Sequence, residues 1–306
     1  MTKTKAWIEA FRLRTLPLSV SGIIVGSALA AILDKWDISI FILAITTTIG
    51  FQVLSNLAND LGDSQKGTDN QNRVGPMRSV QSGAISQSEM KVGMGICALL
   101  SLLSAGALIY VSSHNLTKEL LIFYGVLALL CILAAITYTV GKNAYGYRGL
   151  GDLMVFLFFG MVSVLGVFSL YGLTFEWLVL FPAISIGLWS TAVLNLNNLR
   201  DHVNDKSSGK NTMVVKLGYK GGKNYHAFLI IGGFATWFFT VLSLAYLTFN
   251  YFLFIAIMPS ILLLFHLQKV FATEEPTNLD PELKKVALLT FFSAVLFAVI
   301  SNLFLH

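Results

Sequence analysis

The chain alternates between long apolar runs and shorter polar connections. Nine runs approach the roughly 20 mostly apolar residues that a membrane-spanning helix needs. They cover approximately 16–33, 38–57, 92–112, 120–140, 153–173, 177–198, 226–248, 250–268 and 286–304. Every run is free of Lys, Arg, Asp and Glu, as expected when one such charge costs about 2.5–3.5 kcal/mol at the bilayer centre. The pattern predicts an all-α fold class, a polytopic membrane helix bundle of nine transmembrane helices forming one domain over residues 1–306.

Two polar connections are much longer than the others, at 58–91 and 199–225. Each begins with an Asn- and Asp-rich phrase and later contains a second phrase that ends in Gly, at Gly83 in the first and Gly218 in the second. This likeness is a weak sign of a repeat in which each half of the chain supplies one polar motif.

The charged residues set the orientation. Only 12% of the 306 residues are charged, against about 25% in an average soluble domain. If the N-terminus lies in the cytoplasm, all but two of the 21 lysine and arginine residues, Lys35 and Lys118, fall in cytoplasmic segments. The net charge of +5 therefore needs no nucleic-acid-binding surface. We expect a multi-pass protein of the cytoplasmic (inner) membrane, with both long loops on the cytoplasmic face.

The first apolar run has a second interpretation. Basic residues followed by an apolar run that ends in Ala28-Leu29-Ala30 are also typical of a signal peptide. We favour a membrane span, because eight further spans follow and removal of the first would reverse the charge bias. The spacing Gly22-x-x-x-Gly26 also predicts close packing against another helix.

The first polar motif continues the second apolar run. Asn56, Asn59, Asp60 and Asp63 are three, four or seven residues apart and so share one face of a helix. These carboxylates, together with Asp69, would repel each other unless a cation lay among them. Mg²⁺ is typically bound by one or two carboxylates plus substrate phosphates. The alternative is a solvated helix end.

The second motif, Asn197, Asn198, Asp201 and Asp205, ends the sixth run in the same way. Two acidic clusters on one side of the membrane can face each other across a cavity and grip a diphosphate through bound Mg²⁺. We therefore predict that the metal ligands and catalytic acids are Asp60, Asp63, Asp201 and Asp205.

Basic side chains would contact the phosphate oxygens that the metal leaves free. Lys66, Arg73 and Arg78 follow the first motif, and Tyr138 and Lys142 end the fourth run, four residues apart and so on one face. For each cation, the positive-inside rule is a sufficient alternative explanation.

Residues 209–212, Gly-Lys-Asn-Thr, resemble a phosphate loop only faintly. They lack the upstream Gly, and no Ser or Thr directly follows the Lys.

These motifs resemble those of the UbiA superfamily of intramembrane prenyltransferases over nearly the whole chain. The resemblance is carried by the phrases at 12–17, 56–63, 66–69, 73–76, 80–83, 138–142, 147–152, 195–205, 209–212 and 217–218. The phrases Arg-Val-Gly-Pro at 73–76 and Asn-Asn-Leu-Arg-Asp at 197–201 favour its naphthoate branch. Many members have an Asp where this chain has Gly67, and Asp69 follows two residues later, which leaves open whether Asp69 binds metal.

The resemblance implies transfer of a polyprenyl group from a polyprenyl diphosphate to 1,4-dihydroxy-2-naphthoate, with Mg²⁺ as cofactor and loss of CO₂. The product would be a demethylmenaquinone, in menaquinone biosynthesis, and the prenyl tail would lie between helices facing the lipid bilayer. The substrate-binding residues are then expected to be Asn56, Asn59, Lys66, Asp69, Arg73, Arg78, Tyr138, Lys142, Asn197 and Asn198. Two alternatives remain: another aromatic acceptor, such as 4-hydroxybenzoate or homogentisate, and a membrane transporter.

Overall fold

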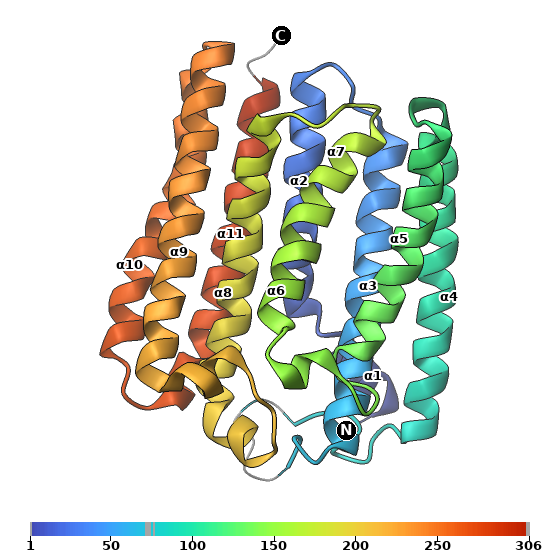
Figure 1. Cartoon of the computed structure of the whole chain (residues 1–306), viewed down its shortest axis with the longest axis vertical. Coiled ribbons are helices and arrows are strands. Elements are labelled where there is room, and N and C mark those ends of the chain that lie inside the picture. The colour runs from blue at the N-terminus through green and yellow to red at the C-terminus, as the bar shows by residue number, and fades with distance from the viewer. Residues whose placement is uncertain (1, 71–74, 76, 304–306) are drawn as a thin grey trace.

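The computed structural model describes residues 2–70, 75 and 77–303. Within these residues, nine helical segments are long and apolar enough to cross a membrane, as the sequence predicts. They run side by side along one axis, and the two chain termini lie at opposite ends of the bundle (Figure 1). The segments that carry the acidic motifs gather at the same end as the start of the chain, which we call the motif end.

The helices follow the predicted order. The first half contains α1 (Lys3–Phe11), α2 (Leu16–Ile32), α3 (Ile38–Gln65), α4 (Gln87–Ser112) and α5 (Lys118–Thr137). The fifth span is composite: α6 (Gly151–Val155), a π-helical segment η4 (Phe156–Gly166) and α7 (Val167–Leu170). The remainder comprises α8 (Trp177–Ser207), α9 (Met213–Thr248), α10 (Met258–Ala272) and α11 (Asp280–Leu303). Short 3₁₀ turns are η1 (Leu13–Thr15), η2 (Ser113–Asn115), η3 (Tyr145–Arg148), η5 (Tyr251–Ile257) and η6 (Pro276–Leu279).

Both motif-bearing helices extend further than their apolar runs. Helix α3 continues to Gln65 and α8 to Ser207, so both acidic motifs are helical. Helix α9 begins at Met213, with a non-helical Gly218 inside it. The loop predicted at 199–225 is therefore much shorter. Hydropathy marks only the apolar part of each helix, and the acids beyond it are buried at the motif end.

An aromatic cluster joins three helices of the second half. Trp189 of α8, Trp237 of α9 and Phe297 of α11 are fully buried, and their rings pack in sequence with centroids 5.7 and 5.3 Å apart. The indole N–H of Trp237 donates to the carbonyl of Ala256 at 3.2 Å, which satisfies its buried polar group. This cluster fixes α8, and with it the second motif, against α9 and α11.

Small residues bring α2 against η4. A methyl group added at Gly22 or Gly26 would lie only 2.9 or 2.5 Å from a backbone carbonyl oxygen of η4. The predicted role of the Gly-x-x-x-Gly spacing in close helix packing is confirmed, and the partner is the fifth span.

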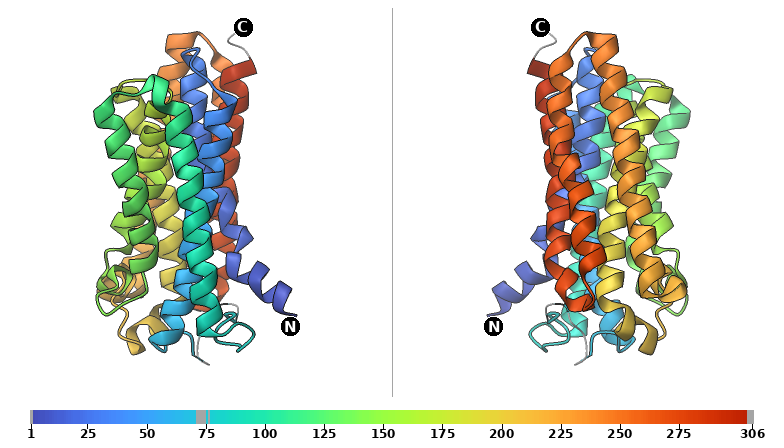
Figure 2. Two further views of the ribbon diagram at one scale, coloured as in Figure 1. Left: turned by 90° about the vertical axis from the view of Figure 1, so that its right-hand side faces the viewer. Right: turned by 90° about the vertical axis from the view of Figure 1, so that its left-hand side faces the viewer.

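Helix α1 leaves the bundle at an angle at the motif end (Figure 2). Its buried face is formed by Ala6 and Ala10. Asn56 of α3 fixes the junction between α1 and α2, because its side-chain amide donates to the carbonyl of Phe11 at 2.9 Å and to the hydroxyl of Thr15 at 3.2 Å.

Candidate active site

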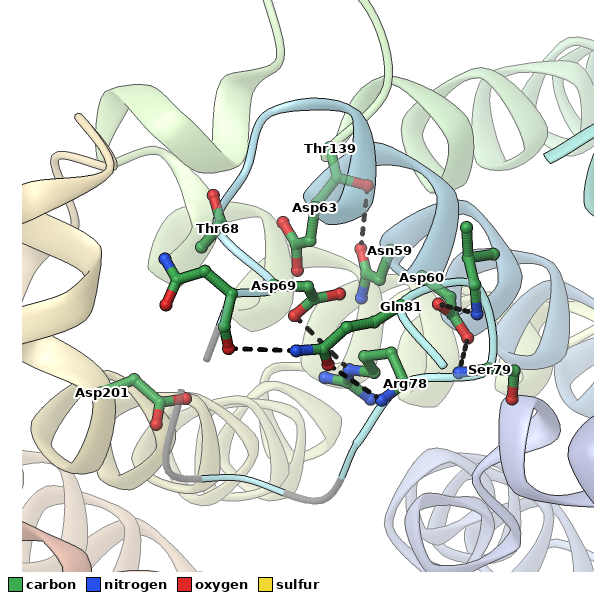
Figure 3. Close-up of polar contacts among 12 residues, drawn as sticks. Asn59, Asp60, Asp63, Thr68, Asp69, Arg78, Ser79, Gln81, Thr139 and Asp201 are labelled. Atoms are coloured by element: carbon green, nitrogen blue, oxygen red, sulfur yellow. Dashed lines mark hydrogen bonds and ion pairs between the residues drawn. The ribbon is translucent and has the colours of Figure 1, made fainter. Parts of the chain in front are cut away.

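The end of helix α3 packs against Thr139, which follows the end of α5. Gly62 packs so closely on the backbone of Thr139 that an added methyl would lie 2.6 Å from its carbonyl carbon. The Thr139 hydroxyl donates to the carbonyl of Ala58 at 2.9 Å and contacts the side-chain oxygen of Asn59 at 3.2 Å. These contacts fix the orientation of the motif face of α3 (Figure 3).

The two acids of the first motif have different partners. Both oxygens of Asp60 accept backbone N–H groups of the following loop, from Ser79 at 3.1 Å and Val80 at 3.2 Å (Figure 3). Asp63 instead accepts the phenolic O–H of Tyr147 at 2.8 Å. Asp63 lines the central cavity, whereas Asp60 holds the loop onto α3. The structure thus gives Asp60, expected to bind metal, a loop-anchoring role.

The second motif divides in a similar way. Arg200, which is almost fully buried, places two nitrogens on the two oxygens of Asp201, at 2.9 and 2.6 Å. Arg200 also pairs with Asp280 at the start of α11 and donates to the side-chain oxygen of Asn197 at 2.9 Å. Asp201 is therefore neutralised within the protein.

The remaining acid of each motif faces one shared cation. The Lys210 ammonium lies 4.0 Å from an oxygen of Asp63 and 3.8 Å from an oxygen of Asp205. All three side chains are at most 10% exposed. The backbone N–H of Lys210 also donates to the carbonyl of Asp205 at 2.8 Å. Lys210 therefore joins the two motifs across the site.

Tyr147 of η3 lies within cation–π distance of two lysines. The Lys66 ammonium is 4.1 Å from the centre of its ring and that of Lys210 is 5.5 Å away. Its hydroxyl contacts both Asp63 and the hydroxyl of Thr68. The segment that connects the fourth and fifth spans is therefore part of the site.

The titration of the groups outside the spans follows from these contacts. Burial alone would lower the pKa of Lys210, but the carboxylates of Asp63 and Asp205 outweigh it and raise the pKa above its usual range. Burial raises the pKa of Tyr138 to about 12. Burial lowers the pKa of Lys66, and the nearby Asp63 opposes that effect. At neutral pH, Lys210 is a cation and Tyr138 a neutral hydrogen-bond donor.

A second ion pair lies at the other edge of the first motif. The Arg78 guanidinium is 4.0 Å from Asp69, and the Gln81 amide donates to the carbonyl of Asn70 at 3.0 Å (Figure 3). Arg78 lines the cavity together with Arg12 and Arg14.

A cavity of about 520 Å³ opens from these groups into the bundle. Its polar end is lined by Arg12, Arg14, Asn56, Asn59, Asp63, Arg78, Tyr138, Asn197 and Lys210. Its deeper wall is mostly apolar and includes Ile23, Phe51, Leu108, Tyr124, Phe158, Phe159 and Val167. The arrangement can hold an anionic head group at one end and an apolar chain along the rest.

Several predicted residues lie elsewhere. Helix α5 ends at Thr137, and Gly141, with a φ of 94°, separates Tyr138 from Lys142. The prediction that the two share one helical face is therefore wrong. Tyr138 lines the cavity, and Lys142 is exposed outside it. Asn198 is buried in α8. Arg73 lies outside the described residues.

Sequence reasoning missed Lys210, Tyr147, Arg200 and Asp280 as members of the site. Lys210 stands within the phrase at 209–212, which carries the family resemblance but is only faintly like a phosphate loop. Tyr147 and Arg200 stood within phrases that carry the family resemblance, which was the available signal. No local pattern marked Asp280, since it reaches the site only through the packing of α11.

The residues suit a magnesium ion shared with a substrate. In the described part of the chain, no three His, Cys, Asp or Glu side chains converge into a preformed metal cage. Asp63 and Asp205, however, approach the same point, and one oxygen of Asp205 is buried without a hydrogen-bond partner. Two carboxylates that leave positions open for phosphate oxygens are a donor set typical of Mg²⁺.

The bundle and its acidic motif end define a membrane enzyme class that comparison with known proteins identifies. The chain belongs to the UbiA prenyltransferase family, whose profile matches residues 19–289. It is 47% identical over 234 residues to the 1,4-dihydroxy-2-naphthoate octaprenyltransferase of Escherichia coli, covering 76% of this chain and 75% of the relative. The Haemophilus influenzae enzyme of the same name is 41% identical over 307 residues, covering 97% and 95%.

Solved structures share the fold. A UbiA homolog from Archaeoglobus fulgidus bound to GPP and Mg²⁺ aligns with a TM-score of 0.66 at 14% identity, covering 95% of this chain and 99% of that one. The apo structure of a UbiA homolog from Aeropyrum pernix aligns with a TM-score of 0.65 at 16% identity, covering 91% and 97%. The predicted all-α membrane fold and family are confirmed.

Proposed function

We propose that the protein transfers a polyprenyl group from a polyprenyl diphosphate to 1,4-dihydroxy-2-naphthoate in menaquinone biosynthesis. The observation that carries the proposal is the convergence of Asp63, Asp205 and Lys210 at the polar mouth of a largely apolar cavity. The two relatives named for this activity, which match three quarters or more of the chain, favour the naphthoate acceptor over other aromatic acids.

The polar end of the cavity would bind the diphosphate. Arg12, Arg78 and Lys210 bring positive charge to it, and the neutral Tyr138 hydroxyl adds a hydrogen-bond donor. Mg²⁺ held by Asp63 and Asp205 would neutralise the charge that develops on the diphosphate as it leaves. Asp201 lies one helical turn from Asp205 and would enter a metal's coordination shell only by giving up Arg200.

The reaction balances without a further reagent. The C–O bond to the diphosphate breaks and its electron pair leaves with the diphosphate. The electron-rich naphthoate ring forms the new C–C bond, and the carboxylate leaves as CO₂ while its electron pair restores the aromatic ring. The direct product is the quinol form of a demethylmenaquinone. The apolar wall of the cavity would keep water from the allylic carbon.

The placement in the cell follows from the charge pattern. With the motif end in the cytoplasm of the inner membrane, the soluble naphthoate would approach the site from the aqueous side. The prenyl chain would enter from the bilayer and lie along the apolar wall of the cavity.

The test is to incubate the purified protein with Mg²⁺, a polyprenyl diphosphate and a panel containing 1,4-dihydroxy-2-naphthoate, 4-hydroxybenzoate and homogentisate. Mass spectrometry should find prenylated naphthalenediol lacking the carboxyl group, and prenyl diphosphates of graded length would define the preferred donor. Prenylation of 4-hydroxybenzoate in its place would contradict the acceptor assignment, and no prenylation of any acid would contradict the activity.

A further inference from the structure

Lys210 occupies the point where the two acidic motifs meet. Its ammonium pairs with both Asp63 and Asp205, which come from helices α3 and α8, more than a hundred residues apart in sequence. These carboxylates are at most 9% exposed, so they need a nearby positive charge. Lys210 supplies that charge without a metal.

The contacts of Lys210 are long for a permanent ion pair. Its ammonium lies 4.0 and 3.8 Å from the two carboxylate oxygens, whereas charge-assisted hydrogen bonds are usually about 2.7–2.9 Å long. One oxygen of Asp205 has no hydrogen-bond partner. The two acids are therefore neutralised but remain available as ligands.

The Lys210 ammonium has a second position available to it, at the polar end of the cavity. It lines the polar end of the cavity, beside Arg78 and Arg12, where the diphosphate would lie. A lysine ammonium on a flexible four-carbon stem can change partners without moving the backbone. Its backbone is fixed meanwhile by the N–H bond to the carbonyl of Asp205 at 2.8 Å.

We propose that Lys210 holds the place of the metal between Asp63 and Asp205 in the metal-free protein, and that Mg²⁺ arriving with the diphosphate displaces its ammonium onto the phosphate oxygens. This inference rests on the proposed function for the diphosphate site. It makes metal and diphosphate bind together: the metal alone competes with Lys210, and the diphosphate gives the displaced ammonium a new anion.

The test measures Mn²⁺ binding to the full-length protein in detergent by the EPR signal of free Mn²⁺, with and without inorganic pyrophosphate and without any aromatic acceptor. The affinities of Mn²⁺ for the protein alone and for pyrophosphate alone predict how much Mn²⁺ is bound if the two do not cooperate. Wild-type protein with pyrophosphate should bind Mn²⁺ at least about tenfold more tightly than that prediction. Lys210→Met should bind Mn²⁺ alone about tenfold more tightly than wild type, since one repelling charge is gone. The same variant should bind the Mn²⁺–pyrophosphate pair less tightly.

Lys206→Met is the matched control, because Lys206 is exposed on the last turn of α8 and should leave all of these affinities unchanged. Lys210→Gln provides a second neutral variant if Lys210→Met does not fold. Unchanged or weaker Mn²⁺ binding in the neutral variants would overturn the proposal. So would wild-type protein whose Mn²⁺ affinity does not respond to pyrophosphate, a result that requires no variant. Prenylation of the wrong acceptor would contradict the proposed function and leave these metal measurements unaffected.

Discussion

The two acidic motifs look alike in sequence but are held in different ways. Asp60 of the first motif is fixed by two backbone N–H groups, whereas Asp201 of the second is fixed by the Arg200 guanidinium. Each motif is left with one acid, Asp63 or Asp205, that faces the same lysine. Resemblance between two motifs therefore does not make their acids equivalent.

The difference follows from what each helix end packs against. Helix α3 ends beside a loop whose backbone N–H groups at Ser79 and Val80 need acceptors. Helix α8 ends beside the start of α11, where Arg200 forms a second ion pair with Asp280. One motif thus anchors a loop, and the other fastens two helices together.

The largest expected effect is at the proposed metal site. Asp63→Asn should lower the rate of Mg²⁺-dependent prenyl transfer roughly a thousandfold, because the metal that would stabilise the departing diphosphate loses one charged ligand. The variant should still insert and fold, since asparagine can keep the hydrogen bond from Tyr147. Initial rates on purified protein measure this. If Asp63→Asn kept the wild-type rate, Asp63 would not be a metal ligand.

Asp60→Ala should act on stability. It removes both acceptors of the Ser79 and Val80 amides, and unpaired buried groups cost about 1–3 kcal/mol each. The free energy of unfolding, measured by denaturant titration in detergent, should fall by about 2 kcal/mol or more. A stable Asp60→Ala protein that has lost Mn²⁺ binding would reverse the roles given to the two acids of this motif.

Asp280→Asn tests the link between the second motif and α11. The side chain of Asp280 is 43% exposed, so its ion pair with Arg200 contributes modestly and the prenyl-transfer rate should fall by about fivefold or less. The exposed Glu274→Gln, just before η6, serves as the control and should change nothing. A complete loss of activity in Asp280→Asn would show that Asp280 does more than pair with Arg200.

The smallest effect concerns pH. Because burial raises the pKa of Tyr138 to about 12, its hydroxyl stays protonated at working pH. The activity ratio of Tyr138→Phe to wild type should therefore be flat between about pH 7 and 9. The raised pKa contributes stability below about pH 10, which is lost as the pH rises toward 12. A ratio that changes within the neutral range would mean that Tyr138 ionises there.

Much of the fold could be predicted from the apolar runs, because a bilayer-spanning helix needs a length and an absence of charge that a sequence displays directly. The helix ends were harder. Hydropathy stops α3 near residue 57 and α8 near residue 198, but both helices continue through their polar motifs. Hydropathy detects the membrane, whereas backbone hydrogen bonding decides where a helix ends.

The site was predictable to the level of the motifs. The spacing predicted that Asp63 and Asp205 belong to the site. The hydrogen bonds of the loop to Asp60 and the pairing of Arg200 with Asp201 depend on tertiary packing and could not be predicted. Lys142 was expected on a helix that in fact ends five residues earlier. Lys210 follows a helix and meets Asp63 only in the folded chain, so no local pattern could pair them.

The central claim is that one acid from each motif, Asp63 or Asp205, binds a shared metal ion while Asp60 holds the loop. Mn²⁺ binding in the presence of pyrophosphate, followed by EPR, tests it most directly in Asp63→Asn, Asp205→Asn and Asp60→Asn. We predict that the first two variants lose Mn²⁺ binding and that Asp60→Asn keeps it. Loss in Asp60→Asn together with retention in Asp63→Asn or Asp205→Asn would contradict the account.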